Sequence, residues 1–279
     1  MESATIAERM QKIQSVFKTG QGLAYDKNEV AINHFLTNEN HLFESVAYEG
    51  VACGLAENDI DEMNGFNNWQ HFLELNTTHS TQIHIGLGWA LALKKQTATT
   101  STPVIQSVME ARVFDGYGYV EGLFRKRIAI LQRVIPEQIT TNQQMGYDQG
   151  LGRSMWYNAK GEVTVLNEII SSFPPARLPD LWRGVGIAVG YVGGAKVPEL
   201  TTLAASSNTF NLDFKVGLLL SQFSRFHSSN MDVTSHVAIL KILNLDKTYF
   251  EQLYSIQLSK SILNTYVEYL QDIKDKLTC

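Results

Sequence analysis

A glycine-centred motif recurs along most of this 279-residue chain and constrains its fold more than any other feature. Six segments carry the motif, the last in degenerate form. Their first glycines, separated by 30 to 36 residues, are Gly50, Gly86, Gly116, Gly150, Gly184 and Gly217. A nearly constant period of this length is typical of repeat proteins. We therefore expect one supersecondary unit of roughly 34 residues to be repeated about six times.

The residues around these glycines indicate α-helices. The residue three before each glycine is apolar or aromatic: Ala47, Ile83, Val113, Tyr147, Leu181 and Phe214. The residue four after it is small in five of the six copies: Gly54, Ala90, Ser154, Ala188 and Ser221. These spacings fall on one face of a helix. Because glycine inside a helix costs about 1 kcal/mol relative to alanine, we expect close helix–helix contacts to compensate.

The segments between the glycine helices have helical apolar spacing and are predicted to be partner helices. They are residues 28–37, 66–75, 103–112, 163–173 and 198–207, with a more polar and less defined partner at 136–145. A helix at 233–243 and a long helix from Thr248 to about Leu277 follow. The sequence thus predicts a single all-α domain over residues 1–279, an array of about six helix-hairpin repeats of the α-solenoid or TPR-like type. The N-terminal helix is expected at 2–18, the repeats at about 27–229 and the C-terminal capping helices at 232–279.

Composition excludes some classes of protein. The net charge of −5 gives no excess of cations to bind nucleic acid. The basic cluster around Arg125–Arg127 is therefore interpreted as a solvated helix end. The longest apolar stretches, such as residues 83–93, are too short to span a bilayer, and residues 1–19 lack the apolar core of a signal peptide. With two cysteines, Cys53 and Cys279, and no disulfide framework, we expect a cytoplasmic protein without an integral membrane segment.

Several blocks in the chain resemble one protein family. They are Tyr48-Glu-Gly-Val-Ala-Cys-Gly-Leu-Ala, Ile83-His-Ile-Gly-Leu-Gly-Trp-Ala-Leu-Ala, Phe114-Asp-Gly-Tyr-Gly-Tyr, Tyr147-Asp-Gln-Gly-Leu-Gly-Arg-Ser-Met-Trp-Tyr, Phe173-Pro-Pro-Ala-Arg-Leu-Pro-Asp-Leu-Trp-Arg-Gly-Val-Gly and Tyr191-Val-Gly-Gly. Over roughly residues 8–255 the chain is similar to the DUF1702 family, whose bacterial members are often encoded beside enediyne polyketide synthases. The resemblance implies a part in the maturation of a polyketide or polyene, and it supplies no catalytic residues.

A second helical column carries the candidate site. One residue before and three residues after the glycines, positions that are neighbours one turn apart, the chain has acids, arginines and aromatic residues. The position two before the glycines adds Tyr48, His84, Phe114, Asp148, Trp182 and Lys215. If the glycine helices stack side by side, this edge becomes one continuous surface. The candidate catalytic acids are Asp148, Asp115 and Glu49. The candidate substrate-binding residues are His84, Tyr119, Arg153, Trp156, Trp182 and Arg183.

Two interpretations of these polar residues remain open. In the functional one, the aromatic faces hold an elongated unsaturated chain and a carboxyl group, its pKa raised by burial, transfers protons. In the structural one, the acids and arginines pair with each other between repeats, as Asp148 with Arg183 or Asp115 with Arg153.

Other chemistries find less support in the sequence. The histidines at 71, 79 and 84, and those at 227 and 236, lack the spacing of a zinc site, so no metal and no cofactor are expected. Ser154 does not lie in a Gly-x-Ser-x-Gly elbow, and Cys53 is interpreted as an inert core residue. The Gly-x-Gly pairs follow no strand, which favours a packing role over phosphate binding.

Two functions from different classes remain. The first is an enzyme or substrate-holding accessory protein that acts on a polyketide-derived polyene, or a similar hydrophobic intermediate, in enediyne-type natural-product biosynthesis. The second is an α-solenoid scaffold that binds a peptide or a partner enzyme, such as one associated with the polyketide synthase. A closed, apolar-walled cavity favours the first function, and an open, wet groove favours the second.

Overall fold

The computed structural model describes residues 4–96 and 107–278, which form only helices and the turns between them. The all-α prediction is therefore confirmed for this part of the chain. Three pieces of the sequence predictions lie outside it: residues 2–3 of the N-terminal helix, residues 103–106 of one partner helix, and Cys279.

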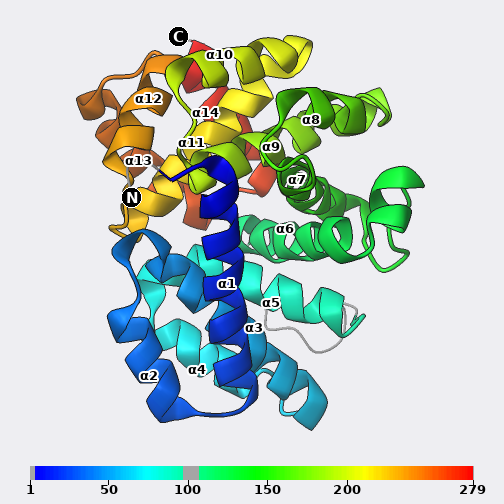
Figure 1. Ribbon diagram of the computed structural model, residues 1–279, viewed down its shortest axis with the longest axis vertical. Helices are drawn as coiled ribbons and strands as arrows, with labels where there is room; N and C mark the ends of the chain where they lie inside the picture. The colour runs from blue at the N-terminus through cyan, green and yellow to red at the C-terminus, as the bar shows by residue number, and fades with distance from the viewer. Residues whose placement is uncertain (1–3, 97–106, 279) are drawn as a thin grey trace.

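Seven helices form the centre of the molecule and are called the helix row below (Figure 1). Each packs mainly against its neighbours in the row. They are α1 (Ile6–Tyr25), α3 (Glu44–Glu62), α5 (Ser80–Leu93), α6 (Ser107–Phe124), α7 (Thr141–Asn158), α9 (Leu178–Val192) and α11 (Asn211–His227). Six of them are the glycine helices of the sequence. The first, α1, begins with a capping box between Thr5 and Glu8, which satisfies free N–H groups at its start.

The glycines lie where neighbouring backbones touch. A Cβ atom on Gly150 of α7 would lie 1.8 Å from the carbonyl oxygen of Asp115 on α6. A Cβ atom on Gly184 of α9 would lie 1.9 Å from the carbonyl oxygen of Gln149 on α7. Real Cβ atoms do not approach backbone this closely, so only glycine permits the spacing. Dispersion attraction between the touching backbones compensates for glycine's poor helix propensity.

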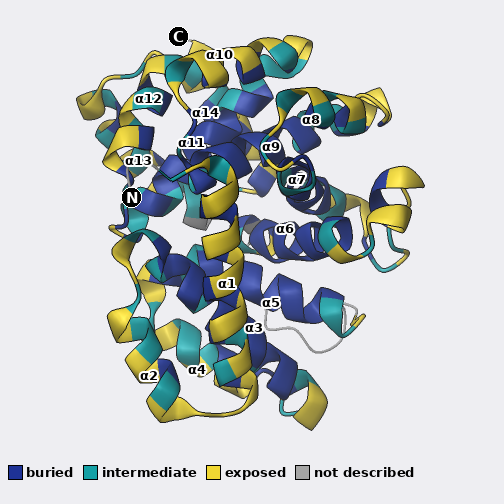
Figure 2. Cartoon of the chain, viewed as in Figure 1, coloured by how far each residue is buried: buried dark blue, intermediate teal, exposed yellow. Residues whose placement is uncertain are grey.

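Short helices lie outside the row at four of the places where the sequence predicts partner helices. They are α2 (Glu29–Asn38), α4 (Asn67–Leu75), α8 (Val163–Ile170) and α10 (Val197–Ser206). The prediction was wrong at two others. Residues 107–112 of the partner predicted at 103–112 are the first turns of α6 itself. In place of the partner predicted at 136–145, residues 136–140 form turns that follow a π-helical segment (Arg127–Leu131), and residues 141–145 begin α7. In Figure 2 the glycine helices of the row are mostly buried, whereas α1 and the outer segments carry many exposed residues.

The C-terminal region differs from the prediction of one long helix. After α12 (Val233–Leu243), the chain forms α13 (Lys247–Leu263) and a separate helix α14 (Tyr266–Thr278). The break follows from a capping box, because Thr265 and Glu268 bond each other's backbone N–H groups and start a new helix. Helix α14 contacts both α6 and α11, so it crosses the row rather than extending its end.

The last helix of the row and the turn after it are hydrogen-bonded back to α5 and to the start of α3. Gln82 of α5 donates to Ser224 of α11 over 2.6 Å. Beyond α11, Asn230 donates to Ser45 over 2.7 Å. The guanidinium of Arg225 donates to the Leu42 carbonyl, 183 residues away in sequence, over 3.2 Å. The row is therefore closed on itself at this side, while its interior stays partly open to solvent.

Candidate functional site

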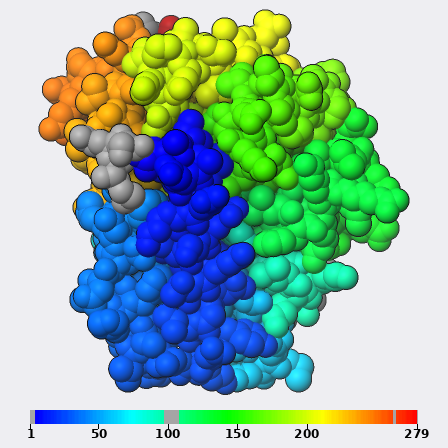
Figure 3. All heavy atoms as spheres, viewed as in Figure 1, coloured from blue at the N-terminus to red at the C-terminus, as the bar shows by residue number. Residues whose placement is uncertain are grey.

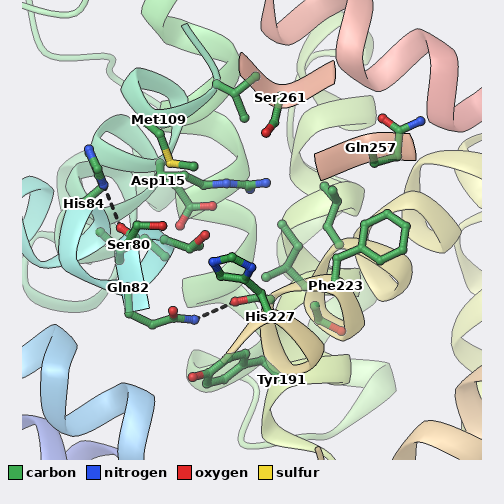
Figure 4. A pocket seen from close by; sticks show the side chains of 18 of the residues that line it. Ser80, Gln82, His84, Met109, Asp115, Tyr191, Phe223, His227, Gln257 and Ser261 are labelled. Carbon is green, nitrogen blue, oxygen red and sulfur yellow. Dashed lines mark hydrogen bonds between the residues drawn. The ribbon is translucent and has the colours of Figure 1, made fainter. Parts of the chain in front are cut away.

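Two cavities lie inside the closed row. The first cavity, about 460 Å³, is lined by residues of α3 to α7, α9, α11, α13 and α14. The second cavity, about 300 Å³, lies between α1 and the neighbouring helices α3, α5, α6, α7 and α9. Glu49, Arg153 and Tyr191 line both cavities, so these three side chains stand at the junction between them. Figure 4 shows Met109, Asp115 and His227 among the side chains around the first cavity.

Glu49, on α3 at the junction, is the acid whose environment most favours proton transfer. Its side chain is buried, and the residue is only 6% exposed. The pKa of Glu49 is raised from 4.5 to about 7, chiefly by burial; the Arg153 guanidinium opposes the rise, and the nearby Asp115 carboxylate adds to it. The Trp89 indole N–H also lies near this carboxylate and lowers its pKa, without meeting hydrogen-bond geometry. At neutral pH Glu49 is therefore present in both protonated and ionised forms.

Asp115 lies on the wall of the first cavity in an ion pair. It pairs with Arg153, one of the two pairs that the sequence suggested. Gln149 donates to its other carboxylate oxygen over 2.5 Å, and Arg183 donates to Gln149 over 2.7 Å. A continuous polar network thus connects α6, α7 and α9. It keeps Asp115 bonded and holds the Arg153 guanidinium at the junction.

Asp148 lines neither the first nor the second cavity. The expected partner Arg183 pairs instead with Asp180 over 2.6 Å. Asp148 accepts hydrogen bonds from Arg177, whose Nε lies 3.0 Å from both carboxylate oxygens. Burial still raises the pKa of Asp148, while Arg177 and Gln144 lower it. This geometry supports the structural interpretation for Asp148.

The remaining candidate residues are divided between cavity and core. His84 lines the first cavity, where its Nδ1 lies 2.6 Å from the Ser80 carbonyl and burial lowers its pKa, so the ring is neutral. Tyr119 lines the second cavity, with the Arg153 guanidinium 4.8 Å from its ring centroid. Trp156 and Trp182 are buried in the core; Trp182 packs edge-on against Phe214. Arg183 is buried behind the network.

The sequence columns miss several residues that line the cavities, because these residues lie one helical turn beyond the positions nearest each glycine. The residues seven positions after four of the glycines line the second cavity. They are Leu93, Leu123, Tyr157 and Tyr191. The same face extends back to −4, where Gln82 and Arg112 line the first cavity. His227 and Tyr254 also line the first cavity, joined by a 2.6 Å contact between Nδ1 and the phenolic oxygen. They lie outside the glycine columns.

The described residues contain no group of three or more histidine, cysteine or acidic side chains arranged to hold a metal ion. The Cys53 thiol is buried, and burial together with neighbouring acids raises its pKa, so the unreactive thiol is the stable form. Across residues 4–96 and 107–278, every helix is too short or too polar to cross a bilayer.

The comparisons with known proteins identify a family without an assigned activity. The model of the family described as "Protein of unknown function (DUF1702)" matches residues 1–276. The chain therefore belongs to the DUF1702 family. No curated protein and no solved structure matches it.

Proposed function

We propose that this member of the DUF1702 family binds an elongated, unsaturated hydrophobic molecule in the first cavity and that Glu49 exchanges a proton with it. The observation that carries the proposal is a buried carboxyl group with a pKa of about 7 at the junction of two largely apolar cavities. A carboxyl group poised near neutral pH can act as both acid and base.

The lining of the first cavity supports a hydrophobic ligand. Its walls carry aliphatic and aromatic side chains from six helices: Leu73, Ile85, Val108, Met109, Ile187, Leu220, Phe223 and Leu258. Its volume of about 460 Å³ lies within the range typical of small-molecule sites. The second cavity adds an aromatic group in which Trp89 contacts both Phe17 and Tyr119, with centroids 4.1 and 5.3 Å apart. Such rings suit the flat faces of a conjugated chain.

The charged groups at the junction have separate roles in this proposal. Glu49 is the proton donor or acceptor. Asp115 is held by Arg153 and Gln149, and its negative charge keeps the pKa of Glu49 high. Arg153 stabilises the ionised form of Glu49 after a proton has left.

The class of substrate comes from the family resemblance and remains part of the proposal. The resemblance implies that bacterial members are often encoded beside enediyne polyketide synthases, which favours a polyketide-derived polyene as the bound molecule. We also propose that the protein is cytoplasmic.

The alternative, a solenoid scaffold for a peptide or partner enzyme, also belongs here. We propose that the helix row is a repeat array, but one whose interior is not free to take a peptide. Helix α1 lies across one face (Figure 3), and five of its residues line the second cavity. Helices α13 and α14 contribute five lining residues to the first. The cover that these helices give to the interior favours a small molecule over a peptide.

A binding experiment tests the proposal. The probe is the methyl ester of a conjugated octadecatetraenoic acid, which fluoresces in apolar surroundings. Met109→Trp places a larger ring in the first cavity, whereas Met63→Trp makes the same change at a residue that is 90% exposed. We expect wild type and Met63→Trp to bind the ester equally and Met109→Trp to bind it at least tenfold more weakly. Equal binding by all three proteins would contradict the proposed site.

The proton transfer has its own test. In deuterium oxide, the wild-type protein should introduce deuterium into the bound tetraene, detected by mass spectrometry of the recovered ester. Glu49→Gln should bind the ester with similar affinity and introduce none. Uptake that is unaffected by Glu49→Gln would remove Glu49 from the chemistry while leaving the binding site intact.

A further inference from the structure

One charged side chain in the first cavity takes no part in the networks described above. Arg112 lies on α6, one turn before Asp115, and both line the first cavity. The residue is only 8% exposed. Its guanidinium carbon lies 5.6 Å from the ring centroid of Tyr266 on α14. Arg112 is therefore a buried cation on the cavity wall, held between α6 and α14.

The other four arginines that are buried in the described part of the chain all have polar partners. Arg9 pairs with Asp232, Arg177 with Asp148 and Arg183 with Asp180. Arg225 donates to the carbonyls of Leu42, Tyr191 and Asn230. For Arg112, no carboxylate and no hydrogen-bond acceptor of the described residues is within bonding distance.

A guanidinium on a largely apolar cavity wall is costly without a counter-charge, and the Arg112 nitrogens, none of which is among the fully buried atoms without a partner, are open to the cavity. The other charged groups on the cavity wall do not supply one, because Asp115 pairs with Arg153 and Glu49 forms no ion pair with Arg112. With Glu49 in its protonated form, the lining carries Arg112 and Arg153 against the single charge of Asp115. The cavity then has an uncompensated positive charge at Arg112.

We propose that the molecule bound in the first cavity carries a carboxylate and that Arg112 binds this group. The inference rests on the proposed function, whose ligand it specifies as an anionic chain such as a long-chain polyenoic acid. The planar guanidinium fork suits the two oxygens of a carboxylate. The apolar walls then lead the chain from Arg112 toward Glu49 and Arg153 at the junction.

The single unpaired positive charge of Arg112 also argues against a phosphate or diphosphate at this position. Those groups carry two or more negative charges, and their sites in proteins combine several cations, a helix N-terminus or a metal ion. Among the described residues that line the first cavity, Arg112 is the one arginine without an ionic partner, and no lysine lines it. One cation matches one carboxylate.

The test compares two probes that differ only in charge: the conjugated octadecatetraenoic acid and its methyl ester, at pH 8, where the acid is ionised. We expect wild type to bind the acid at least tenfold more tightly than the ester. Arg112→Met should abolish this preference by weakening the acid tenfold or more while leaving the ester unchanged. Arg112→Lys should retain part of it. The control Arg127→Met removes an exposed arginine that lines neither cavity and should behave as wild type.

The outcomes separate this inference from the proposed function. Ester and acid that bind wild type equally would overturn the carboxylate site while the hydrophobic site stands. The same holds if Arg112→Met weakens both probes equally, because Arg112 then only shapes the wall. If neither probe binds, the proposed function and this inference fail together. Should Arg112→Met not fold, the acid-to-ester ratio of wild type and of Arg112→Lys still decides the question.

Discussion

For Glu49→Gln the structure predicts a pH-dependent change in the free energy of unfolding. The pKa of Glu49 rises from 4.5 to about 7 on folding, chiefly because the carboxyl group is buried. Each pKa unit corresponds to about 1.4 kcal/mol, so keeping this group ionised in the folded protein costs about 3 kcal/mol. Glutamine has nearly the same shape as the protonated acid and cannot ionise, so the variant avoids this cost.

The sign of the effect follows from where the proton is held. Between pH 4.5 and 7 the folded protein keeps the Glu49 proton that the unfolded chain has already lost. Folding then takes up a proton, and the contribution of Glu49 to stability falls as pH rises through this window. Below pH 4.5 the wild type and Glu49→Gln should be equally stable. Above pH 7 the variant should be more stable by about 3 kcal/mol, or roughly 6 °C in melting temperature.

Urea denaturation followed by circular dichroism at several pH values between 4 and 8 measures this difference. The quantity to compare is the free energy of unfolding of Glu49→Gln minus that of wild type at each pH. The contributions of all other titrating groups cancel in this difference. Glu74→Gln, a change of an exposed glutamate on α4, serves as the control and should give a flat difference curve. A flat curve for Glu49→Gln as well would refute the reasoning, because Glu49 would then titrate alike in both states.

Two further predictions concern the framework around the site, and denaturation measurements check both. Asp148→Asn leaves the buried Arg177 without its counter-charge and should destabilise the fold by about 3–5 kcal/mol; unchanged stability would make Asp148 a catalytic candidate again. Gly150→Ala places a Cβ atom 1.8 Å from the Asp115 carbonyl oxygen and should destabilise the protein by about 3 kcal/mol. Gly22→Ala, on α1 with nothing within 4 Å, should stabilise it by up to about 1 kcal/mol; equal effects at both glycines would contradict the account of the row.

The period of the glycines predicts much of the fold and part of the candidate site. Because Gly150 and Gly184 allow neighbouring backbones to touch, residues at the same offset from each glycine lie along one interior face. For this reason Glu49 and Asp115, each one residue before a glycine, and Arg153, three residues after one, all line the first cavity. The regular spacing of side chains along a helix is sufficient for such a prediction.

What the period could not predict lies in the irregular segments. Arg177, the partner of Asp148, lies in a short turn before α9 and in no glycine column. The capping box of Thr265 and Glu268 breaks a stripe that reads as continuous, and it directs α14 across the row. The closure of the row depends on contacts such as that of Arg225 with Leu42, between residues far apart in sequence, which no local pattern encodes.

A crystal structure of the protein with a long-chain polyenoic acid that carries bromine at its methyl end tests the central claim most directly. The anomalous signal of bromine locates the chain end independently of the protein. We expect the bromine inside the helix row, the chain in the first cavity beside Glu49, and the carboxylate at Arg112. A bromine site on the outer surface, or a first cavity filled only by solvent, would contradict the proposal that this protein holds an elongated hydrophobic molecule.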